Sequence, residues 1–511
     1  MWVMDFDKIS LLSIAAISSL PVVADDINVA RPNVLLIYAD DLGYGDLECY
    51  KSAVVKTPNI NKLSANGLQF ANGYAVASTS TPSRYSLLTG EYAWRRKGTD
   101  VAGGDAAMII SSERYTVADL FKEAGYVTGV FGKWHLGLGD VSGAQDWNGV
   151  ISPSPSDIGF DKHYIMAATG DRVPCVFIED GRVANYDTSE PIEVSYNKNF
   201  DGQPTGKDNP ELLYNLRSTH GHNMSIINGI GRIGYMKGGG SALWKDETIA
   251  DSITVRAVDF IRSHSNTPFF LYFAANDIHV PRFPHERFRG ASGMGLRGDA
   301  IVQFDWSVGR LVAALRDCGI LDNTLIILTS DNGPVADDGY DDRAEELMGK
   351  HKPTGSLRGG KYSAFEGGTR VPFIISWPAV VETGKVSDAL VSQIDFLSTM
   401  ASLVGVDLPD GAASDGENNL MSWLGKESNG RSFVVSQASN HTLSLRTKSW
   451  KYIEPKGGPK MVPWGPEIET GYSLQPQLYD MSVEGEKVNV ADRYIAITNE
   501  MARLLSLLKS R

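Results

Sequence analysis

The chain has 511 residues and a formal net charge of -13, and its composition is that of a globular protein. This length exceeds one compact core of ordinary size but fits a large α/β domain followed by a smaller one. The acidic balance argues against nucleic acid or an anionic membrane as a partner, so an anionic substrate would need a local cationic pocket.

The N-terminus has the organisation of a secretory signal peptide. Lys8 precedes the apolar run 9–20, and the small residues up to Ala24 offer a cleavage point. We therefore predict a signal peptide over residues 1–24 and export to the periplasm or the extracellular space. The apolar run is too short to span a membrane comfortably, and no other segment of the sequence is a better candidate.

Five continuous apolar runs have the length of strands. They cover residues 33–39, 126–131, 269–274, 324–329 and 371–376. Continuous runs, unlike alternating ones, indicate strands buried on both faces, as in a parallel or mostly parallel sheet. Helical patterns lie between them, for instance after the predicted N-cap Thr116 and over residues 301–315. This alternation predicts an α/β domain with a mostly parallel central sheet flanked by helices.

Polar residues follow four of these runs at once. They are Asp40 and Asp41 after the first run, Lys133 and His135 after the second, His279 after the third, and Asp331 and Asn332 after the fourth. In doubly wound sheets the ligand binds beyond the carboxyl ends of the strands. The four clusters together therefore predict one site assembled from several strand ends.

Residues 78–90, STSTPSRYSLLTG, do not resemble a core segment. Small and polar residues dominate the run, and Pro82 restricts the backbone between Ser80 and Arg84. This composition is typical of a loop. The composition of this run alone does not explain the presence of Arg84 four residues after Ser80, so the explanation must come from other segments of the chain.

The remaining segments predict long loops and a second structural unit. Residues 140–245 are rich in Gly, Asn and Asp, which predicts loops that lie over the sheet and carry specificity. After about residue 430 short strands are expected at 433–437, 442–446, 450–453 and 477–480, followed by a helix over 493–509. We therefore predict a catalytic α/β domain over residues 25–430 and a smaller C-terminal α+β subdomain with an antiparallel sheet over residues 431–511.

The side chains at the strand ends predict a metal ion and an anion. Oxygen ligands alone are offered by Asp40, Asp41, Asp331 and Asn332. Such ligands favour Ca²⁺, with Mg²⁺ as the second choice, over Zn²⁺. No cysteine or histidine pair at zinc spacing lies near them. A small tetrahedral or planar anion would be bound by the cations Arg84, Lys133 and Lys361 together with His135 and His279.

Several of these stretches together resemble the type I sulfatases. Ser80 to Arg84, followed by Thr89 and Gly90, resembles the defining motif of that family, in which cysteine or serine precedes x-Pro-x-Arg and then Thr-Gly. Further matches cover its second motif at 125–137, its metal-binding segments at 33–46 and 325–333, its sulfate-binding lysine segment at 359–372 and its closing motif at 478–480. The resemblance spans most of the chain and implies an alkaline-phosphatase-like fold and the hydrolysis of sulfuric esters.

The resemblance implies a modified nucleophile at Ser80. In the family the first motif residue is oxidised to formylglycine, and the hydrated aldehyde is the nucleophile, whereas an unmodified serine is a poor nucleophile at neutral pH. Pro82 and Arg84 fit the short motif that the modifying enzyme recognises. A serine at this position implies a radical, iron–sulfur maturase of the serine type, as found in bacteria.

The resemblance also implies roles for the other polar residues. Arg84 and Lys133 would stabilise the nucleophile, and His135 would take its proton when sulfate leaves. His279 would be the general acid that protonates the departing alkoxide, and Lys361 would bind a sulfate oxygen. The implied ligands of one Ca²⁺ are Asp40, Asp41, the modified Ser80, Asp331 and Asn332.

One position departs from the pattern of the family. Many relatives carry arginine after Thr89 and Gly90, whereas this chain carries Glu91. The position lies outside the five-residue core of the motif, so the implied chemistry is unchanged. We expect only the bracing of this loop to differ.

The expected substrate is a sulfated glycan, with a galactose-type or N-acetylhexosamine sulfate favoured. The segments 218–240 and 349–360 are candidate sugar-recognition loops, and their candidate contacts are His220, His222, His351 and Arg358. A histidine outside a matched motif is more often structural than catalytic. This structural interpretation is given to His163, His264, His285 and His441.

Two other functions stay open at the level of the sequence. One is a phosphate or phosphonate monoester hydrolase of the same superfold, which a comparison of sulfate and phosphate esters of one aryl alcohol would distinguish. The other is a glycan-binding protein without catalysis, in which Ser80 is never oxidised. The mass of the peptide that contains Ser80 would distinguish that one.

Overall fold

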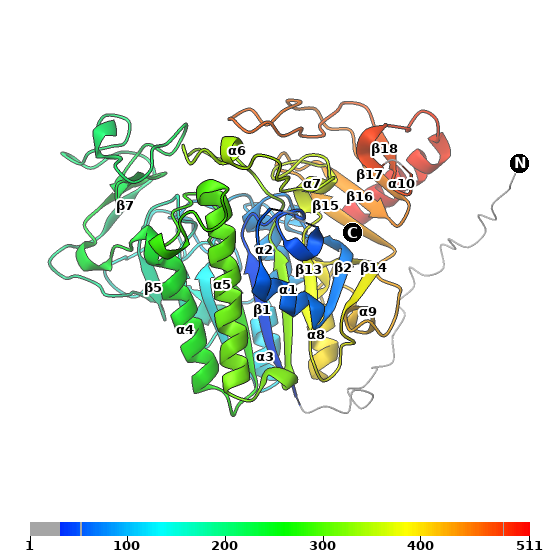
Figure 1. The fold of residues 1–511 in the computed structure, drawn as a ribbon, viewed down its shortest axis with the longest axis horizontal. Coiled ribbons are helices and arrows are strands. Elements are labelled where there is room, and N and C mark those ends of the chain that lie inside the picture. The colour runs from blue at the N-terminus through cyan, green and yellow to red at the C-terminus, as the bar shows by residue number, and fades with distance from the viewer. Residues whose placement is uncertain (1–30, 52–53, 484) are drawn as a thin grey trace, which may run out of the picture.

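The computed structural model describes residues 31–51, 54–483 and 485–511, so the predicted signal peptide lies outside the described residues. A ten-stranded sheet forms the centre (Figure 1), in the order β14-β2-β13-β12-β1-β11-β3-β4-β5-β6. Its strands are β1 (Asn33–Ala39), β2 (Leu68–Tyr74), β3 (Val127–Lys133), β4 (Lys162–Met166), β5 (Phe177–Glu179), β6 (Arg182–Val183), β11 (Phe269–Ala274), β12 (Thr324–Ser330), β13 (Phe373–Ser376) and β14 (Lys385–Ser392).

The middle of the sheet is parallel. β12, β1, β11, β3 and β4 pair in parallel, and every residue of β1, β11 and β12 is buried. This arrangement confirms the predicted α/β class and explains why the runs show no alternation, since both faces of these strands are covered. β13 is antiparallel to both of its neighbours, β12 and β2. The start of β13 therefore lies at the same edge of the sheet as the ends of the parallel strands.

Two groups of helices flank the sheet. α1 (Pro58–Ala65), α4 (Ile249–Ser263) and α5 (Gly295–Asp317) pack together, and α2 (Ser80–Thr89), α3 (Val117–Glu123) and α8 (Phe396–Val404) form the other group. The predicted cap of α3 is confirmed, because Thr116 accepts from the backbone of Asp119 while the Asp119 side chain accepts from the Thr116 backbone. The apolar stripe at 301–315 is the buried face of α5.

The prediction of a loop at residues 78–90 is wrong. Residues 80–89 form α2, and all ten are buried. Pro82 is tolerated because it stands in the first turn, where a backbone N–H has no partner within the helix. Polar composition indicated a surface loop, but the polar side chains of this helix have partners in the interior, which include Lys133, Asp331 and the backbone of His135.

The prediction that residues 140–245 are loops over the sheet is only partly correct. β4, β5 and β6 come from this segment and extend the main sheet. Two small sheets add to it, formed by β7 (Glu193–Ser195) with β10 (Tyr235–Lys237) and by β8 (Ile226–Ile227) with β9 (Ile230–Gly231). The strands are too short and too polar in their surroundings to be recognised by periodicity.

The C-terminal part contains the predicted antiparallel sheet. β15 (Phe433–Gln437), β16 (Leu443–Thr447), β17 (Trp450–Ile453) and β18 (Gln477–Asp480) pair in this order, and α10 (Ile495–Lys509) packs Met501, Leu505 and Leu508 into their core. A boundary near residue 430 stays a prediction. We call the segment between β17 and β18, residues 454–476, the hairpin arm; it reaches in orange across the top of Figure 1.

Buried charges join the C-terminal sheet to the rest of the molecule. Lys451 of β17 lies 3.1 Å from Glu366, which precedes β13, and 2.8 Å from Glu486. All three side chains are almost fully buried. Because unpaired buried charges are costly, this group fixes the two parts against each other. Within the described ranges, no helix has the length and apolarity needed to cross a bilayer.

Candidate active site

The first residue of α2, Ser80, lies at the carboxyl edge of the parallel strands. Its Oγ accepts a hydrogen bond from Nζ of Lys133 at 2.9 Å. Thr81 Oγ1 donates to the carbonyl of His135 at 3.0 Å, and Ser83 Oγ donates to the carbonyl of Ala77 at 3.0 Å. The bonds to Lys133 and His135 fasten the first turn of α2 to the end of β3, so the position of Ser80 relative to Lys133 is fixed.

Arg84 is a fully buried cation whose partner is a carboxylate of the predicted metal site. Its Nε and Nη2 donate to Oδ2 of Asp331 at 3.1 and 2.8 Å, and its Nη1 donates to the Tyr272 hydroxyl at 3.2 Å. Although burial opposes the charge, Tyr272 and Asp331 raise the pKa of Arg84 above its ordinary value. Of the two predicted partners of Ser80, Lys133 contacts its hydroxyl, whereas Arg84 holds Asp331.

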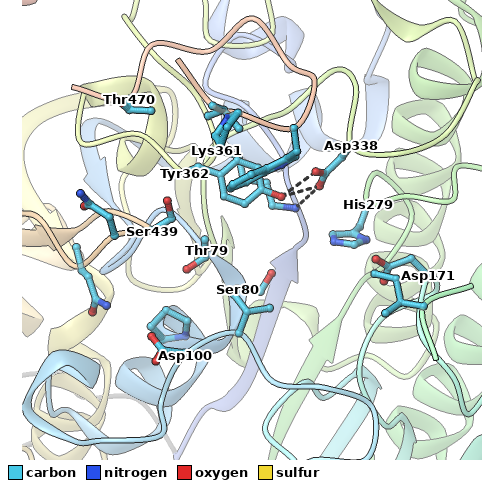
Figure 2. A pocket seen from close by; sticks show the side chains of 18 of the residues that line it. Thr79, Ser80, Asp100, Asp171, His279, Asp338, Lys361, Tyr362, Ser439 and Thr470 are labelled. Carbon is cyan, nitrogen blue, oxygen red and sulfur yellow. Dashed lines mark hydrogen bonds and ion pairs between the residues drawn. The ribbon is translucent and has the colours of Figure 1, made fainter. Parts of the chain in front are cut away.

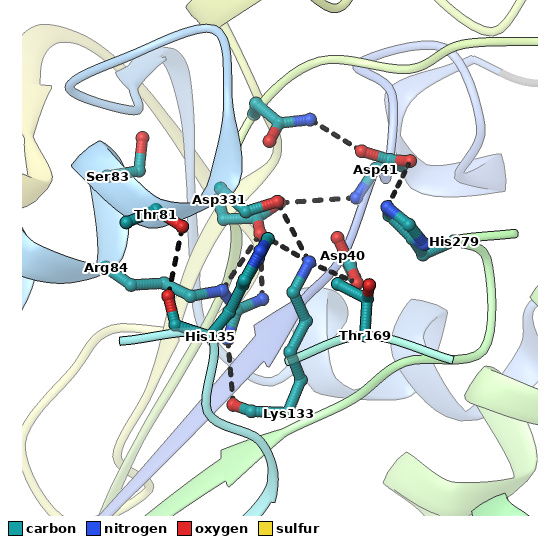
Figure 3. A network of polar contacts seen from close by, with 12 residues as sticks. Asp40, Asp41, Thr81, Ser83, Arg84, Lys133, His135, Thr169, His279 and Asp331 are labelled. Atoms are coloured by element: carbon teal, nitrogen blue, oxygen red, sulfur yellow. Dashed lines mark hydrogen bonds and ion pairs between the residues drawn. The ribbon is translucent and has the colours of Figure 1, made fainter. Parts of the chain in front are cut away.

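Four of the five predicted metal ligands lie together, Asp40, Asp41 and Asp331 (Figure 3) with Asn332 bonded to Asp41. Asn332 Nδ2 donates to Asp41 Oδ1 at 2.7 Å, and the Asp41 backbone N–H donates to Asp331 Oδ1 at 3.3 Å. Asp40 Oδ2 accepts from Lys133 Nζ at 2.7 Å. All four side chains are buried at the ends of β1 and β12, which are adjacent parallel strands.

Two oxygens in this group have no hydrogen-bond partner among the described residues. They are Oδ1 of Asp40 and Oδ1 of Asn332, both shielded from solvent. Buried acceptors without a partner carry the full cost of desolvation. Burial raises the pKa of Asp40 well above its usual value, with Asp331 and Asp41 adding to the shift against the opposing Lys133. A bound cation would satisfy both oxygens and favour the charged form of Asp40, so the residues present fit a divalent metal.

His135 follows β3 with a left-handed backbone, φ 59°. Its Nε2 lies 3.0 Å from the carbonyl oxygen of Ala102, which requires a proton on Nε2, and its buried Nδ1 has no partner in the described part of the chain. Burial and the nearby Lys133 hold the pKa of His135 well below its ordinary value. The imidazole is therefore neutral and offers a free lone pair on Nδ1.

His279 follows β11 and reaches the same edge. Its Nδ1 donates to the carbonyl of Val280 at 2.7 Å, and its Nε2 lies 4.0 Å from Oδ2 of Asp41. Burial, followed by the charges of Lys361 and Lys133, lowers the pKa of His279 well below its ordinary value. The free imidazole is therefore neutral, and an anion beside Nε2 would favour its protonation.

Lys361 is held by two carboxylates, one of which the sequence did not single out. Its Nζ donates to Asp41 Oδ2 at 2.9 Å and to Asp338 Oδ2 at 3.0 Å, and the Tyr362 hydroxyl donates to Asp338 at 2.8 Å. Although burial opposes the charge, Asp338 and Asp41 hold the pKa of Lys361 well above its usual value. Lys361 precedes β13, and it reaches the site because that strand runs antiparallel.

Glu91, the departure from the family pattern, is bound at the far end of α2. It lies 2.9 Å from both Arg96 and Arg114, and it accepts from the Tyr85 hydroxyl at 2.8 Å. Glu91 follows the last turn of α2, whereas Ser80 begins the first. Its contacts brace the helix, which agrees with the expectation that the change leaves the chemistry alone.

A pocket of about 750 Å³ opens over this edge (Figure 2). Ser80, His135, His279 and Lys361 line it, together with residues from the loops after β4 and from the C-terminal sheet and the hairpin arm. Figure 2 shows Asp171 beside His279 on one side and Ser439 and Thr470 on the opposite side. The C-terminal part therefore builds one wall of the site.

The four predicted sugar contacts divide into two pairs. His220 and His222 line the pocket, and His222 Nε2 lies 3.0 Å from Oδ2 of Asp171. His351 and Arg358 do not line it, so the structure gives no support for these two as sugar contacts. His351 Nε2 bonds the buried carboxylate of Asp46 at 2.8 Å.

Arg358 is not among the lining residues of the pocket and is bound by other side chains. Its Nε and Nη2 each lie 2.7 Å from the carboxylate oxygens of Glu469, and its guanidinium stacks over Phe365 at 4.0 Å. The charge of Arg358 is thus neutralised by the hairpin arm, which carries Glu469.

His441 differs in position from the other histidines that were given a structural interpretation. It lines the pocket, and its Nε2 lies 3.2 Å from Asp100, which also lines it. The structural interpretation agrees with the positions of His163, which accepts from the backbone of Gly181 at 2.7 Å, and of His264 and His285, which bond their own helix turns. Lining residues for which the sequence carried no motif are Asp171, Arg172, Asp338 and Trp464.

Comparisons with known proteins agree on the family. The sulfatase family model matches residues 32–406. An N-acetylgalactosamine-6-O-sulfatase of Bacteroides thetaiotaomicron is 50% identical over 485 residues, which cover 95% of this chain and 94% of that protein. A solved structure from work on glycosaminoglycan metabolism by Bacteroides thetaiotaomicron has a TM-score of 0.92 at 50% identity and covers 94% of this chain and 100% of its own.

A phosphonate monoester hydrolase of Agrobacterium radiobacter shares the fold at a TM-score of 0.57 and 19% identity, covering 94% of this chain and 96% of that one. At this identity the likeness concerns the fold alone, so it does not compete with the sulfatase matches. The chain belongs to the sulfatase family and is a sulfuric ester hydrolase.

Proposed function

We propose that this enzyme removes the 6-O-sulfate group of N-acetylgalactosamine residues in sulfated glycans. The observation that carries the proposal is the 50% identity, over nearly the whole of both chains, to a sulfatase named for this reaction. A pocket of about 750 Å³ with hydroxyl, amide and imidazole groups on its walls supports a sugar as the ligand. The proposal includes export to the periplasm or the extracellular space.

The nucleophile of the proposed reaction is carried by Ser80. Oxidation to formylglycine by a serine-type radical maturase would supply a hydrated aldehyde, a stronger nucleophile than a serine hydroxyl. Lys133 donates to the oxygen of this side chain and would hold it in place. His135 would accept its proton on Nδ1, which is neutral and unpartnered among the described residues.

The proposed metal is one Ca²⁺, with Mg²⁺ as the second choice. Asp40, Asp41, Asp331, Asn332 and the modified Ser80 would hold it, and all five donors are hard oxygens. Its charge would favour the binding of a sulfate ester in an enzyme whose net charge is -13. Without a metal ion, the buried carboxylates Asp40, Asp41, Asp331 and Asp338 outnumber the buried cations that contact them, which are Arg84, Lys133 and Lys361.

Two residues would act directly on the sulfate group and the leaving oxygen. Lys361 Nζ, held between Asp41 and Asp338, would bind a sulfate oxygen. His279 would donate a proton from Nε2 to the leaving sugar oxygen. The bond from its Nδ1 to the Val280 carbonyl fixes the orientation of the ring for this transfer.

The sugar ring would be recognised by the pocket wall beside His279. Arg172 Nη1 donates to both oxygens of Asp171 at 2.9 Å, and His222 bonds the same carboxylate. This connected polar group would present fixed donors and acceptors to sugar hydroxyls. His220 and His222, which line the pocket, stay candidate contacts, whereas His351 and Arg358 do not line it.

Removal of one metal ligand should reduce the metal content. We expect about one calcium per chain in the purified enzyme and much less in Asp40→Asn, because this change removes a charged ligand from the proposed metal site. Asp299→Asn is the control. Asp299 is a buried carboxylate that accepts from the backbone of Gly290, outside the metal site, so this variant should keep its calcium. Stoichiometric zinc with neither calcium nor magnesium in elemental analysis would contradict the proposed metal.

Removal of His279 should affect substrates according to their leaving group. His279→Ala should slow the hydrolysis of alkyl and sugar sulfates by about 10²–10⁴-fold, the usual contribution of a general acid. The hydrolysis rate of nitrophenyl sulfate should fall much less, because its leaving group departs as a stable anion and needs little protonation. His264→Ala serves as the control. Equal losses on both substrates would assign His279 to binding or structure.

A panel of defined sugars tests the proposed substrate. We expect kcat/KM to be highest for N-acetylgalactosamine 6-sulfate and at least about tenfold lower for N-acetylglucosamine 6-sulfate, since the loss of one hydrogen bond in a built site is worth about 1–2 kcal/mol. N-acetylgalactosamine 4-sulfate and the 6-phosphate ester complete the panel. A preference for the 4-sulfate or the phosphate would refute the proposal.

A further inference from the structure

An aromatic side chain from the hairpin arm faces the pocket beside the sulfate-binding residues. The two halves of the arm pair through backbone hydrogen bonds, from Val462 N to the Ile468 carbonyl at 2.9 Å and from Thr470 N to the Lys460 carbonyl at 2.9 Å. Its tip carries Trp464, which lines the pocket. The arm is therefore an ordered element with one tryptophan at the active site.

The arm is anchored to the segment that carries Lys361. Ala364 N donates to the Thr470 carbonyl at 2.8 Å, Ser363 Oγ donates to the Glu469 carbonyl at 2.7 Å, and the Arg358–Glu469 pair adds two charged bonds. Trp464 itself lies edge-on to Tyr362, with ring centroids 4.8 Å apart. These contacts fix the indole relative to the sulfate-binding lysine.

The indole of Trp464 is partly exposed to solvent within the pocket. Trp464 is 39% exposed, although it stands in a pocket and in contact with Tyr362. Covering a large apolar ring in such a cavity with a flat apolar surface is energetically favourable, because both surfaces are removed from water. The carbon-bound hydrogens of a pyranose ring provide such a surface. The open part of the indole is therefore suited to stack against a sugar that enters the pocket.

The part of the lining that segment 437–472 contributes, Trp464 included, carries no formal charge of its own. Among the described residues, those that segment 437–472 contributes to the lining include no Asp, Glu, Lys or Arg. Their polar groups are amides and hydroxyls such as Asn440, Ser439 and Thr470, and His441 is paired with Asp100. This chemistry suits the hydroxyls of an uncharged sugar better than the carboxylate of a uronic acid.

The size of the pocket leaves room for a second ring. Its volume of about 750 Å³ lies in the upper part of the range, about 300–1,000 Å³, that holds a drug-sized ligand. One sulfated hexosamine is smaller than such a ligand. The Trp464 wall and the Ser80 edge belong to the same cavity, so a linked sugar can occupy both.

We propose that Trp464 and the uncharged lining residues of segment 437–472 form a second subsite, which binds an uncharged pyranose ring linked to the sulfated sugar. The inference rests on the proposed function, because the first ring must place its sulfate at Ser80. It makes Trp464 a residue that selects the neighbour of the sulfated sugar.

The test compares one sulfated sugar with and without a neighbour. The substrates are N-acetylgalactosamine 6-sulfate and disaccharides in which it is linked to galactose or to glucuronic acid. Trp464→Ala should raise KM for the galactose-linked disaccharide about three- to tenfold, the equivalent of an aromatic contact of about 0.5–1.5 kcal/mol. KM for the monosaccharide and kcat for both should stay within about twofold.

Two further variants separate stacking from damage to the arm. Trp464→Phe keeps an aromatic face, so its KM for the galactose-linked disaccharide should lie between those of the wild type and Trp464→Ala. Met461→Ala, on the same arm, 42% exposed and outside the pocket lining, should match wild type. Calorimetric binding of the disaccharide to Ser80→Ala, with and without Trp464→Ala, gives the same comparison without turnover.

The outcomes separate the two proposals. Equal effects of Trp464→Ala on the monosaccharide and the disaccharide, or no effect on either, would overturn the second subsite while leaving the proposed reaction intact. Equal KM for the galactose-linked and glucuronate-linked disaccharides in the wild type would overturn the uncharged neighbour. No sulfate release from any of the three would refute the proposed function, and the calorimetric comparison would still decide the subsite.

Discussion

The architecture of the site depends on pairing buried charges at one edge of the sheet. Asp40, Asp41 and Asp331 cannot lie in the interior unless cations compensate them, and Lys133, Lys361 and Arg84 do so at hydrogen-bond distance. Each cation joins a different segment to a strand end. The same bonds that neutralise the carboxylates therefore also position α2, the end of β3 and the loop before β13.

The topology explains how residues far apart in the chain meet there. The parallel strands β12, β1, β11 and β3 all end at this edge, and β13 begins at it because it runs the other way. The C-terminal sheet and the hairpin arm form the wall of the pocket that faces His279 and Asp171. A rigid arrangement of this kind suits a hydrolase, because preorganised charges need no reorganisation during the reaction.

The sequence predicted the parts of the molecule with strong local signals. Continuous apolar runs identified β1, β11 and β12, and the polar residues after them predicted the edge of the sheet at which the candidate site lies. The helix at Ser80 escaped prediction, because the buried partners of its polar side chains come from distant segments such as Asp331 and His135. Asp338, Asp171 and His441 escaped for the same reason: each reaches the pocket through loop geometry, which has no periodicity. His351 and Arg358 are polar residues in promising loops, but they are bound by Asp46 and Glu469.

The mass of one peptide tests the account most directly. Cleavage after Lys62 and Arg84 releases residues 63–84, which contain Ser80. Active enzyme from a host with a serine-type maturase should yield this peptide lighter by two hydrogens, with fragmentation placing the change at Ser80 and not at Ser78. Ser80→Ala should bind substrate without turning it over, because the buried cations and the metal ligands remain. A fully active preparation with an intact serine at position 80 would contradict the account.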